Sequence, residues 1–285
     1  MIRLDDAALR LIDLALDEDR GAGDWTTRWI VSARARADGT IVAKEAGVIA
    51  GLALGSAVFL RLDPRVEFEA AVSDGDRVEP GQLVASVSGP ARAVLTGERT
   101  ALNFLQRLSG VATLTRKFVD AVAGTRARIL DTRKTTPAWR ALEKAAVRAG
   151  GGENHRFGLF DLVLIKENHA ALAGGVTEAI RRVQDANNKG LRVEVEIHDL
   201  ADLRSALDAR VDRVLLDNMS LEQIAEAVKL VRKRAAGIEI EASGNMTLDR
   251  VRAVAEAGVD FISVGAITHS ATALDLSLRF QADAV

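Results

Sequence analysis

The chain has 285 residues, of which 48% are hydrophobic and 27% charged, with 38 Lys and Arg against 40 Asp and Glu and a net charge of −2. These values exclude a disordered chain, a collagen-like fibre and a strongly basic nucleic-acid binder. The absence of cysteine excludes disulfides, thiolate nucleophiles and Cys-ligated metal sites. We expect a cytoplasmic enzyme, because the acidic amphipathic start does not resemble a signal peptide and no apolar stretch approaches the roughly 20 residues that span a bilayer.

The first part of the chain mixes strands and helices without a regular order. Residues 51–60 have helical spacing, and residues 91–123 form a long helical region that we expect to break at Ser109-Gly110. Strand-like apolar runs, separated by turns that contain Gly, Asp and Pro, cover residues 37–44, 66–72 and 82–88. This mixture predicts an α+β sandwich domain.

From about residue 125, short Val/Ile/Leu-rich runs alternate with amphipathic helical stretches. The six apolar runs are 128–130, 162–165, 193–197, 214–216, 238–240 and 261–264. Strands that alternate with helices indicate right-handed βαβ units and a parallel sheet. Six strands are many for one open sheet and too few for a complete eight-stranded barrel, so we predict an open, TIM-like α/β barrel. The expected domains are the sandwich over 1–115 and the barrel over 116–270, with residues 270–285 packing back on the first domain.

Polar residues follow every strand of the predicted barrel. In a parallel barrel these positions line the active face. They are Asp131-Thr132-Arg133-Lys134, Lys166-Glu167-Asn168-His169, Glu196, Asp217-Asn218, Ser243-Gly244-Asn245 and Gly265-Ala266. A single charge at a strand end is usually only solvated, but a set at all six ends predicts a functional face.

Positive charge is concentrated in one segment of this face. Residues 126–166 contain nine Lys and Arg against four Asp and Glu, together with His155 in a Gly-rich loop. Arg side chains pair with carboxylates and phosphates through two hydrogen bonds, and Lys acts as a point charge. The segment therefore predicts a site for a small polyanion, and the residues best placed to bind it are Arg133, Lys134, Arg156 and Lys166.

Two further features suggest phosphate and metal binding. Small residues end the last two strands, where barrels often bind phosphate at a helix N-terminus, although small residues could also serve close packing. Glu196 and Asp217 end neighbouring strands and could share Mg2+ with substrate phosphates, or could only pair with the basic residues. Of the four histidines, His155 is the best candidate for ligand contact, His169 could orient Lys166, and we expect structural or surface roles for the other two, at 198 and 269.

Long segments of the sequence resemble the quinolinate phosphoribosyltransferase family. The segments include ERTALNFLQRLSGVAT, EVEI, LLDN, EASGN, SVGAITHS and the 39-residue block DTRKTTPAWRALEKAAVRAGGGENHRFGLFDLVLIKENH. The resemblance extends from LALDEDRGAGDWTT to the last predicted barrel strand, with no motif residue replaced. It implies a sandwich domain, an open barrel of about seven strands, and an obligate dimer, sometimes a hexamer, whose active sites face the partner's first domain.

The resemblance also implies a reaction, in which quinolinate and 5-phosphoribosyl-1-pyrophosphate give nicotinate mononucleotide, pyrophosphate and CO2 with Mg2+ as cofactor. The implied catalytic residues are Lys134, Lys166, Glu196 and Asp217, of which the two carboxylates would bind Mg2+ or the ribose. The implied quinolinate ligands are Arg133, His155, Arg156, Lys166 and the neighbouring subunit's copy of Arg99. The implied phosphate and remaining substrate contacts are Thr132, Ser243, Gly244, Asn245, Gly265 and Ala266.

Three other readings remain open at this stage. A relative with altered specificity, such as nicotinate phosphoribosyltransferase or the paralogues that accompany molybdenum transport, would share the architecture. The segment VSDGDRVEPGQLVASVSG resembles half of a biotinyl or lipoyl domain, but its turn has no lysine to modify. A ligand sensor without activity is the third reading, and the intact charged set argues against it.

Overall fold

The computed structural model describes residues 4–280, which divide into two compact units. The units are described separately below. The first contains residues 1–116, 137–151 and 270–285, and the second contains residues 117–136 and 152–269. Of the first unit, residues 1–3 and 281–285 lie outside the described part, and the acidic amphipathic start of the chain contains the helix α1 (Asp6–Arg20). Within residues 4–280, none of the helices combines the length and apolar character that a membrane crossing requires.

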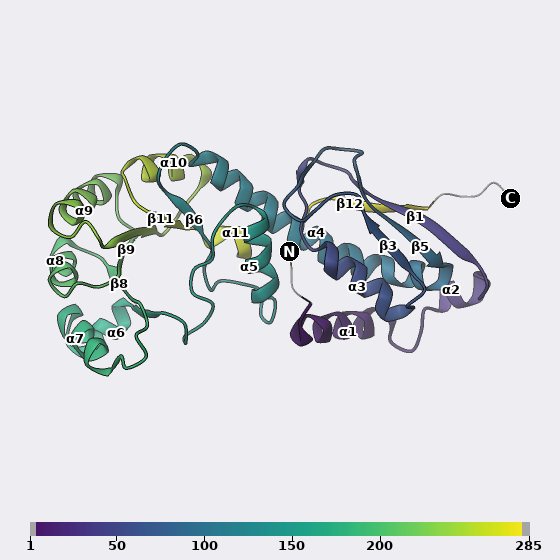
Figure 1. Ribbon diagram of the computed structural model, residues 1–285, viewed down its shortest axis with the longest axis horizontal. Helices are drawn as coiled ribbons and strands as arrows, with labels where there is room; N and C mark the ends of the chain where they lie inside the picture. Colours follow the sequence, from purple (N-terminus) through teal and green to yellow (C-terminus); the bar gives the residue numbers. More distant parts are fainter. Residues whose placement is uncertain (1–3, 281–285) are drawn as a thin grey trace. The chain divides into compact units, whose positions relative to one another are not determined.

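A four-stranded antiparallel sheet is the centre of the first unit (Figure 1). Its strands, in spatial order, are β12 (Leu276–Phe280), β1 (Arg36–Ala43), β5 (Leu83–Pro90) and β3 (Glu67–Ala70). A separate two-stranded ribbon pairs β2 (Gly47–Val48) with β4 (Arg77–Val78). The three strands predicted in this region correspond to β1, β3 and β5. β12 lies in the segment expected to pack back on the first domain, and its Phe280 pairs with Gly39 of β1.

Four helices of this part of the chain accompany the sheet. They are α1, α2 (Trp25–Ile30), α3 (Leu52–Leu62) and α4 (Ala91–Ala121). The first two begin at aspartate caps, because Asp5 accepts a hydrogen bond from the backbone N–H of Ala8 and Asp24 from that of Thr27. The predicted helix over residues 51–60 is α3, and its Phe59 is fully buried in the core.

α4 continues without interruption through the predicted break, so that prediction is wrong. The Ser109 hydroxyl accepts a hydrogen bond from the Ala50 N–H at 3.0 Å and donates one to the Ala50 carbonyl at 3.3 Å. At Gly110, a Cβ atom would overlap the backbone carbonyl of Thr272. Both residues are small because neighbouring segments of the first unit approach the helix closely, and not because the helix ends there.

The helix α5 (Arg140–Ala149) groups with the first unit, a feature that the predicted domain division did not include. We placed residues 137–151 in the second domain, but they belong to the first unit. Trp139 stacks on Phe104 of α4 with ring centroids 4.8 Å apart, and the buried Glu143 pairs with Arg107 of α4 at 3.0 Å. Contacts between positions this far apart in the chain could not be read from the local pattern.

A six-stranded, all-parallel sheet forms the second unit (Figure 1). Its strands, in spatial order, are β6 (Arg128–Leu130), β11 (Phe261–Ser263), β10 (Glu239–Ser243), β9 (Arg213–Asp217), β8 (Val193–Ile197) and β7 (Val163–Ile165). The helices of this unit that follow β7 are α6 (Glu167–Ala173), α7 (Val176–Ala186), α8 (Leu200–Asp208), α9 (Leu221–Arg234), α10 (Leu248–Glu256) and α11 (Ala266–His269).

All six predicted strands of this unit exist, and the predicted fold class, an α/β protein with a first α+β domain and an open barrel, is confirmed. The strand ends differ from the predicted ones by at most three residues. Glu153 adds a single parallel bridge beside Leu130 at the edge of β6. This bridge places the loop that contains His155 next to the strand end that carries Thr132 and Arg133.

Charged side chains alternate along the central strands of this sheet. Because successive strand residues point to opposite faces, Glu194 and Glu196 share a face of β8, and Glu239 and Glu241 share a face of β10. Between these strands, Arg213 of β9 pairs in register with both Glu194 and Glu239. One face of the sheet therefore carries a row of charges where barrels usually have branched apolar residues.

Candidate active site

A pocket of about 490 Å³ lies at the carboxyl ends of the strands of the second unit. Its lining consists of Thr132, Arg133, Lys134, His155, Arg156, Leu164, Lys166, Glu196, Leu215, Asp217, Asn218, Glu241, Ser243, Gly244, Asn245 and Ser263. Most of the residues that we predicted from the strand ends therefore come together in one cavity. The strand-end reasoning included Asn218, but it did not select the apolar pair Leu164 and Leu215, nor Glu241 and Ser263.

Three of the residues implied to contact substrate, and the strand-end residues Asp131, Glu167, Asn168 and His169, are not part of this lining. Arg99 lies on α4 in the first unit, where it lines a smaller pocket of about 250 Å³ together with Asp19 and Arg20. Gly265 and Ala266 lie at the start of α11, and a Cβ atom on Gly265 would come within 3.2 Å of the Lys134 side chain. These two residues therefore lie next to a residue of the pocket without lining it.

Two arginines give one part of the pocket its positive charge. Arg133 is exposed, whereas Arg156 is partly buried and donates a hydrogen bond from Nη1 to the Leu162 carbonyl at 3.1 Å. Burial lowers the pKa of the Arg156 guanidinium, and the positive charge of Arg133 nearby lowers it further. Two guanidinium groups close enough to repel each other favour an anion that bridges them.

Two carboxylates and a histidine form a second group in the site region. Single ligand atoms from Glu196, His198 and Asp217 lie within 4.8 Å of one another. Glu196 also contacts His198 Nε2 at 3.1 Å and Lys166 Nζ at 3.9 Å. We expected a structural or surface role for His198, which is exposed but faces Glu196. Its position directly after β8, two residues after Glu196, is the signal that could have placed it here.

The turns after β9 and β10 have a constrained backbone. Asn218 and Asn245 both adopt left-handed conformations, with φ of 53° and 49°. Asn218 donates a hydrogen bond to Asp217 Oδ2 at 2.7 Å and accepts one from Asn245 at 3.2 Å. A Cβ atom on Gly244 would overlap Asn218, so only glycine permits this approach. Strained positions of this kind persist where neighbouring contacts hold them, and here they orient the Asp217 carboxylate.

Lys166 and His169 occupy the start of α6. The His169 Nδ1 atom accepts a hydrogen bond from the backbone N–H of Lys166 at 3.0 Å, in a capping box at the start of the helix. The predicted role for His169 is the orientation of Lys166. In the structure the His169 ring contacts the backbone of Lys166 and not its ammonium group. The Lys166 ammonium remains directed toward Glu196.

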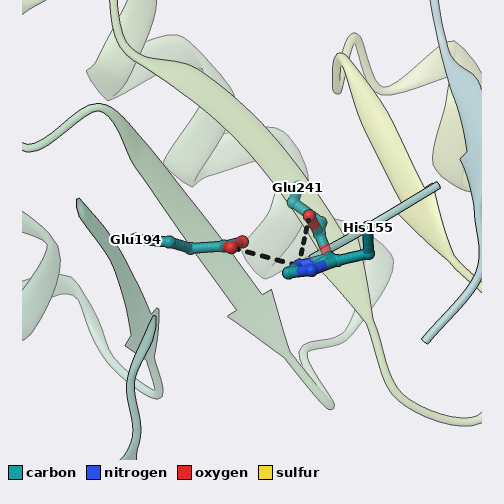
Figure 2. Close-up of side chains that lie close together, drawn as sticks. All are labelled: His155, Glu194 and Glu241. Carbon is teal, nitrogen blue, oxygen red and sulfur yellow. Dashed lines mark ion pairs between the residues drawn. The ribbon is translucent and has the colours of Figure 1, made fainter. Parts of the chain in front are cut away.

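His155 is held at three points of its loop and ring. The buried Asp131 accepts a hydrogen bond from the His155 backbone N–H at 2.9 Å and another from the side chain of Asn154 at 2.6 Å. The imidazole Nε2 lies 3.1 Å from Glu194 and 3.5 Å from Glu241, and Figure 2 shows both carboxylates directed at the ring. The His155 side chain is only 8% exposed.

The two buried glutamates differ from ordinary carboxylates. Burial raises the pKa of Glu241 to about 8, and the negative charge of Glu194 acts in the same direction. Burial also raises the pKa of Glu194, which opposes the effect of the Arg213 guanidinium beside it. Two adjacent carboxylates in a buried region disfavour simultaneous ionisation.

This arrangement predicts that stability decreases as the pH rises. Between the ordinary carboxyl pKa of 4.5 and the raised value of about 8, the folded chain keeps a proton on Glu241 that the unfolded chain has released. The free energy of unfolding should therefore fall across this interval. Urea denaturation at several pH values between 5 and 8.5 would measure the slope. Glu241→Gln should flatten it, and parallel curves for both proteins would contradict the prediction.

Comparisons with known proteins agree with the geometry. Residues 24–109 match the N-terminal domain of quinolinate phosphoribosyl transferase, and residues 111–279 match its C-terminal domain. The chain belongs to the quinolinate phosphoribosyltransferase family. Relatives in this family include a probable nicotinate-nucleotide pyrophosphorylase (carboxylating) from Synechocystis, which is 44% identical over 264 residues, 93% of this chain and 89% of the relative.

Solved structures of this family have the same fold. The nicotinate-nucleotide pyrophosphorylase of Francisella tularensis superposes with a TM-score of 0.91 at 38% identity, over 98% of each chain. NadC from Streptococcus pyogenes superposes with a TM-score of 0.90 at 42% identity, over 95% of this chain and 96% of the other. Family membership therefore covers both units of the chain.

Proposed function

We propose that this protein transfers a phosphoribosyl group from 5-phosphoribosyl-1-pyrophosphate to quinolinate and so forms nicotinate mononucleotide, pyrophosphate and CO2. The reaction is a step of de novo NAD biosynthesis, and we propose that it takes place in the cytoplasm. The observation that carries the proposal is a single pocket, in a chain of this family, that contains two neighbouring guanidinium groups and two partly exposed carboxylates. The two guanidinium groups suit a dianionic acid, and the two carboxylates suit ribose hydroxyls or a bound metal ion.

Quinolinate would bind at the arginines. Its two carboxylates would pair with Arg133 and Arg156, and the Lys166 ammonium and the His155 ring would complete the contacts. Leu164 and Leu215 supply apolar surface in the same lining, which suits the face of a pyridine ring. A second carboxylate distinguishes quinolinate from nicotinate, so the pair of arginines favours quinolinate.

The phosphoribosyl donor would bind at the ends of β9 to β11. The backbone around Gly244, which approaches Asn218 closely, would receive the 5-phosphate together with Ser243 and Asn245. Gly265 and Ala266 remain predicted members of this phosphate site. Thr132, whose hydroxyl accepts a hydrogen bond from the Lys134 backbone N–H at 3.0 Å, would shape the turn that presents Lys134 to the pyrophosphate.

Glu196 and Asp217 would hold Mg2+ or the ribose hydroxyls. Carboxylate oxygens are the protein ligands that Mg2+ prefers, and two of them leave coordination positions for water and substrate phosphates. His198 fits this ion poorly, so we propose that it stays with Glu196 as a hydrogen-bond partner. When bound, Mg2+ would supply neutralisation of charge on the departing pyrophosphate.

The chemistry has two steps, the transfer of the ribosyl group and the loss of CO2. The ring nitrogen lone pair of quinolinate forms a bond to C1 of the ribose while the bond from C1 to the pyrophosphate oxygen breaks, and pyrophosphate leaves with that electron pair. Lys134 and Lys166 would stabilise the leaving charge, and Asp217 the positive charge that develops at C1. The new pyridinium then stabilises the electron pair left at C2 as CO2 departs, and a proton replaces the carboxylate. No covalent bond to Lys166 is required.

We also propose that the protein acts as a homodimer, or as a hexamer built from such dimers, in which Arg99 reaches the active site of the neighbouring subunit. Large apolar side chains are exposed on α2, where Trp29 is 79% exposed and Ile30 is 77% exposed. Exposed apolar surface of this kind is typical of interfaces between subunits. A cationic residue supplied by the partner would also add positive charge to the quinolinate end of the pocket.

The decisive experiment is a direct assay. The protein is incubated with quinolinate, 5-phosphoribosyl-1-pyrophosphate and Mg2+, and nicotinate mononucleotide and pyrophosphate are measured, with nicotinate as the parallel substrate. We expect turnover of quinolinate alone. Turnover of nicotinate alone would overturn the two-carboxylate site, and turnover of neither would favour an altered-specificity relative or a ligand sensor.

A further inference from the structure

The segment that carries Arg133 and Lys134 has no regular secondary structure. Residues 131–136 follow β6 as irregular backbone, and both basic side chains are exposed. Both also line the pocket. A lysine ammonium group sits on a flexible four-carbon chain, so its position depends on how firmly the backbone that carries it is held. The contacts of the Lys134 backbone therefore limit where this charge can act.

Hydroxyl groups hold the Lys134 backbone on both sides. Its N–H donates a hydrogen bond to Thr132 Oγ1 at 3.0 Å, within the same segment. Its carbonyl accepts a hydrogen bond from Thr268 Oγ1 at 2.7 Å. Thr268 belongs to α11, the short helix that follows β11. The first contact is local, whereas the second ties the irregular segment to an element far away in the sequence.

The Thr268 hydroxyl is directed to this carbonyl rather than to its other neighbour. A hydroxyl group has one hydrogen to donate. The Gly265 carbonyl is a second acceptor, but it lies farther away, at 3.2 Å, and it already accepts the backbone N–H groups of Thr268 and His269. Thr268 has no exposed surface, so bulk water does not compete for its hydroxyl.

The turn before α11 also contacts the Lys134 side chain. A Cβ atom on Gly265 would lie 3.2 Å from Lys134 Cδ and 3.1 Å from His269 Nε2. The lysine chain therefore passes directly beside this glycine, which leaves room for it. The backbone and the side chain of Lys134 both lie against the turn for which we propose binding of the 5-phosphate.

We propose that Thr268 is a positioning residue, whose hydroxyl fixes Lys134 for binding to the pyrophosphate group of the donor. Thr268 has no exposed surface with which to touch a ligand, so it acts through the Lys134 carbonyl. The identity of the ligand rests on the proposed function. Arg133 depends less on this bond, because its own carbonyl accepts the Thr135 N–H at 3.0 Å.

Calorimetric titration with inorganic pyrophosphate in the presence of Mg2+ measures this effect without the acceptor substrate. Thr268→Val replaces the hydroxyl by a methyl group and should weaken binding about tenfold or more, because a small displacement of a positioned group has effects of this size. Thr268→Ser keeps the hydroxyl and should stay within about threefold of wild type. Thr268→Cys keeps only a weak S–H donor, so its affinity should lie between those of the other two variants.

A double-mutant cycle separates positioning from a general effect on the fold. Lys134→Met removes the ammonium group, and in that background Thr268→Val should weaken pyrophosphate binding by less than about threefold, because the charge that Thr268 positions is gone. Thr115→Val is the matched control. Thr115 is also fully buried, and its hydroxyl donates to a backbone carbonyl, that of Val111 on α4, at 2.8 Å. This control should bind pyrophosphate like the wild type.

Turnover gives the second readout. Thr268→Val should lower kcat about tenfold or more, and should change the dissociation constant for quinolinate by less than about threefold, since Arg133 keeps its own backbone contact. A merely structural role would affect binding of both substrates. Thr268→Ser should restore most of the lost kcat.

The outcomes separate this inference from the proposed function. A wild-type protein that binds pyrophosphate but does not turn over quinolinate would contradict the proposed function, and the Thr268 variants would still decide the inference. Equal pyrophosphate affinity in wild type and Thr268→Val would overturn the inference, as would a wild type that binds no pyrophosphate. A Thr268→Ser protein as weak as Thr268→Val, or an undiminished effect in the Lys134→Met background, would also overturn it. If circular dichroism shows that Thr268→Val does not fold, equal affinity of Thr268→Cys and Thr268→Ser is the contradicting result.

Discussion

Replacing Arg133 by alanine should raise the dissociation constant for quinolinate by about 30-fold or more, which corresponds to about 2 kcal/mol. Arg133 lines the pocket and lies close enough to Arg156 to affect its pKa. Its removal leaves one substrate carboxylate without a partner in a partly desolvated site, and that group retains its desolvation cost. Arg133 is a cleaner choice than Arg156, which also holds its loop through the Leu162 carbonyl.

Calorimetric titration of quinolinate into the Arg133→Ala protein would measure this effect. Arg204→Ala is the matched control, because Arg204 is exposed on α8 and does not line the pocket. Affinity for 5-phosphoribosyl-1-pyrophosphate should change by less than about threefold in both variants, since each removes no contact to the donor. Quinolinate affinity within about threefold of wild type would show that Arg133 does not bind a carboxylate.

Asp217→Asn should lower kcat by about 100-fold or more and leave quinolinate binding nearly unchanged. The substitution keeps the size of the side chain but removes the charge that we place near C1 and Mg2+. Asn218 and the strained turn hold this carboxylate in one orientation, so a nearby group cannot easily replace it. An effect on turnover without an effect on quinolinate binding indicates an interaction made in the transition state.

Single-turnover assays with saturating substrates would measure the chemical step for this variant. Asp208→Asn is the matched control, since Asp208 is on the exposed face of α8 and pairs with Arg234 at 2.6 Å. A large loss of quinolinate affinity in Asp217→Asn would show that Asp217 contributes to quinolinate binding. An unchanged kcat would show that Asp217 is not a catalytic residue.

The strands of the second unit were predictable because each is a short apolar run between turn residues. β6 and β8 have the predicted bounds, and β9 and β10 extend one to three residues further because polar residues at the strand ends still pair with their neighbours. Helix α4 was predicted with a break because Ser109 and Gly110 are weak helix formers. Tertiary contacts with Ala50 and Thr272 outweigh that local preference.

The candidate site was predictable for residues that follow a strand, because the strand ends of a parallel barrel line the active face. We call this the strand-end rule, and residues outside it were harder to predict. Lys166 and Asp217 follow directly from that rule, Glu196 was included although it lies one residue before the end of its strand, and all three line the pocket. Glu241 lies within its strand, two residues before Ser243, so the rule passed over it although the period of two would have placed it on the same face. Arg99 could only be included through family resemblance, since no local pattern connects α4 with the second unit's strands.

The route of the chain between β6 and β7 limits how this protein can be recombined. The chain passes between the two units four times, because residues 137–151 belong to the first unit while the segments on either side belong to the second. A hybrid of two relatives joined once, near residue 116, would pair one parent's α4 with the other parent's α5. The Phe104–Trp139 stack and the Arg107–Glu143 pair would then join residues of different ancestry. A hybrid that keeps each of these pairs within one parent must take α4 and α5 from the same parent. The two family domains are therefore not independently exchangeable at a single junction.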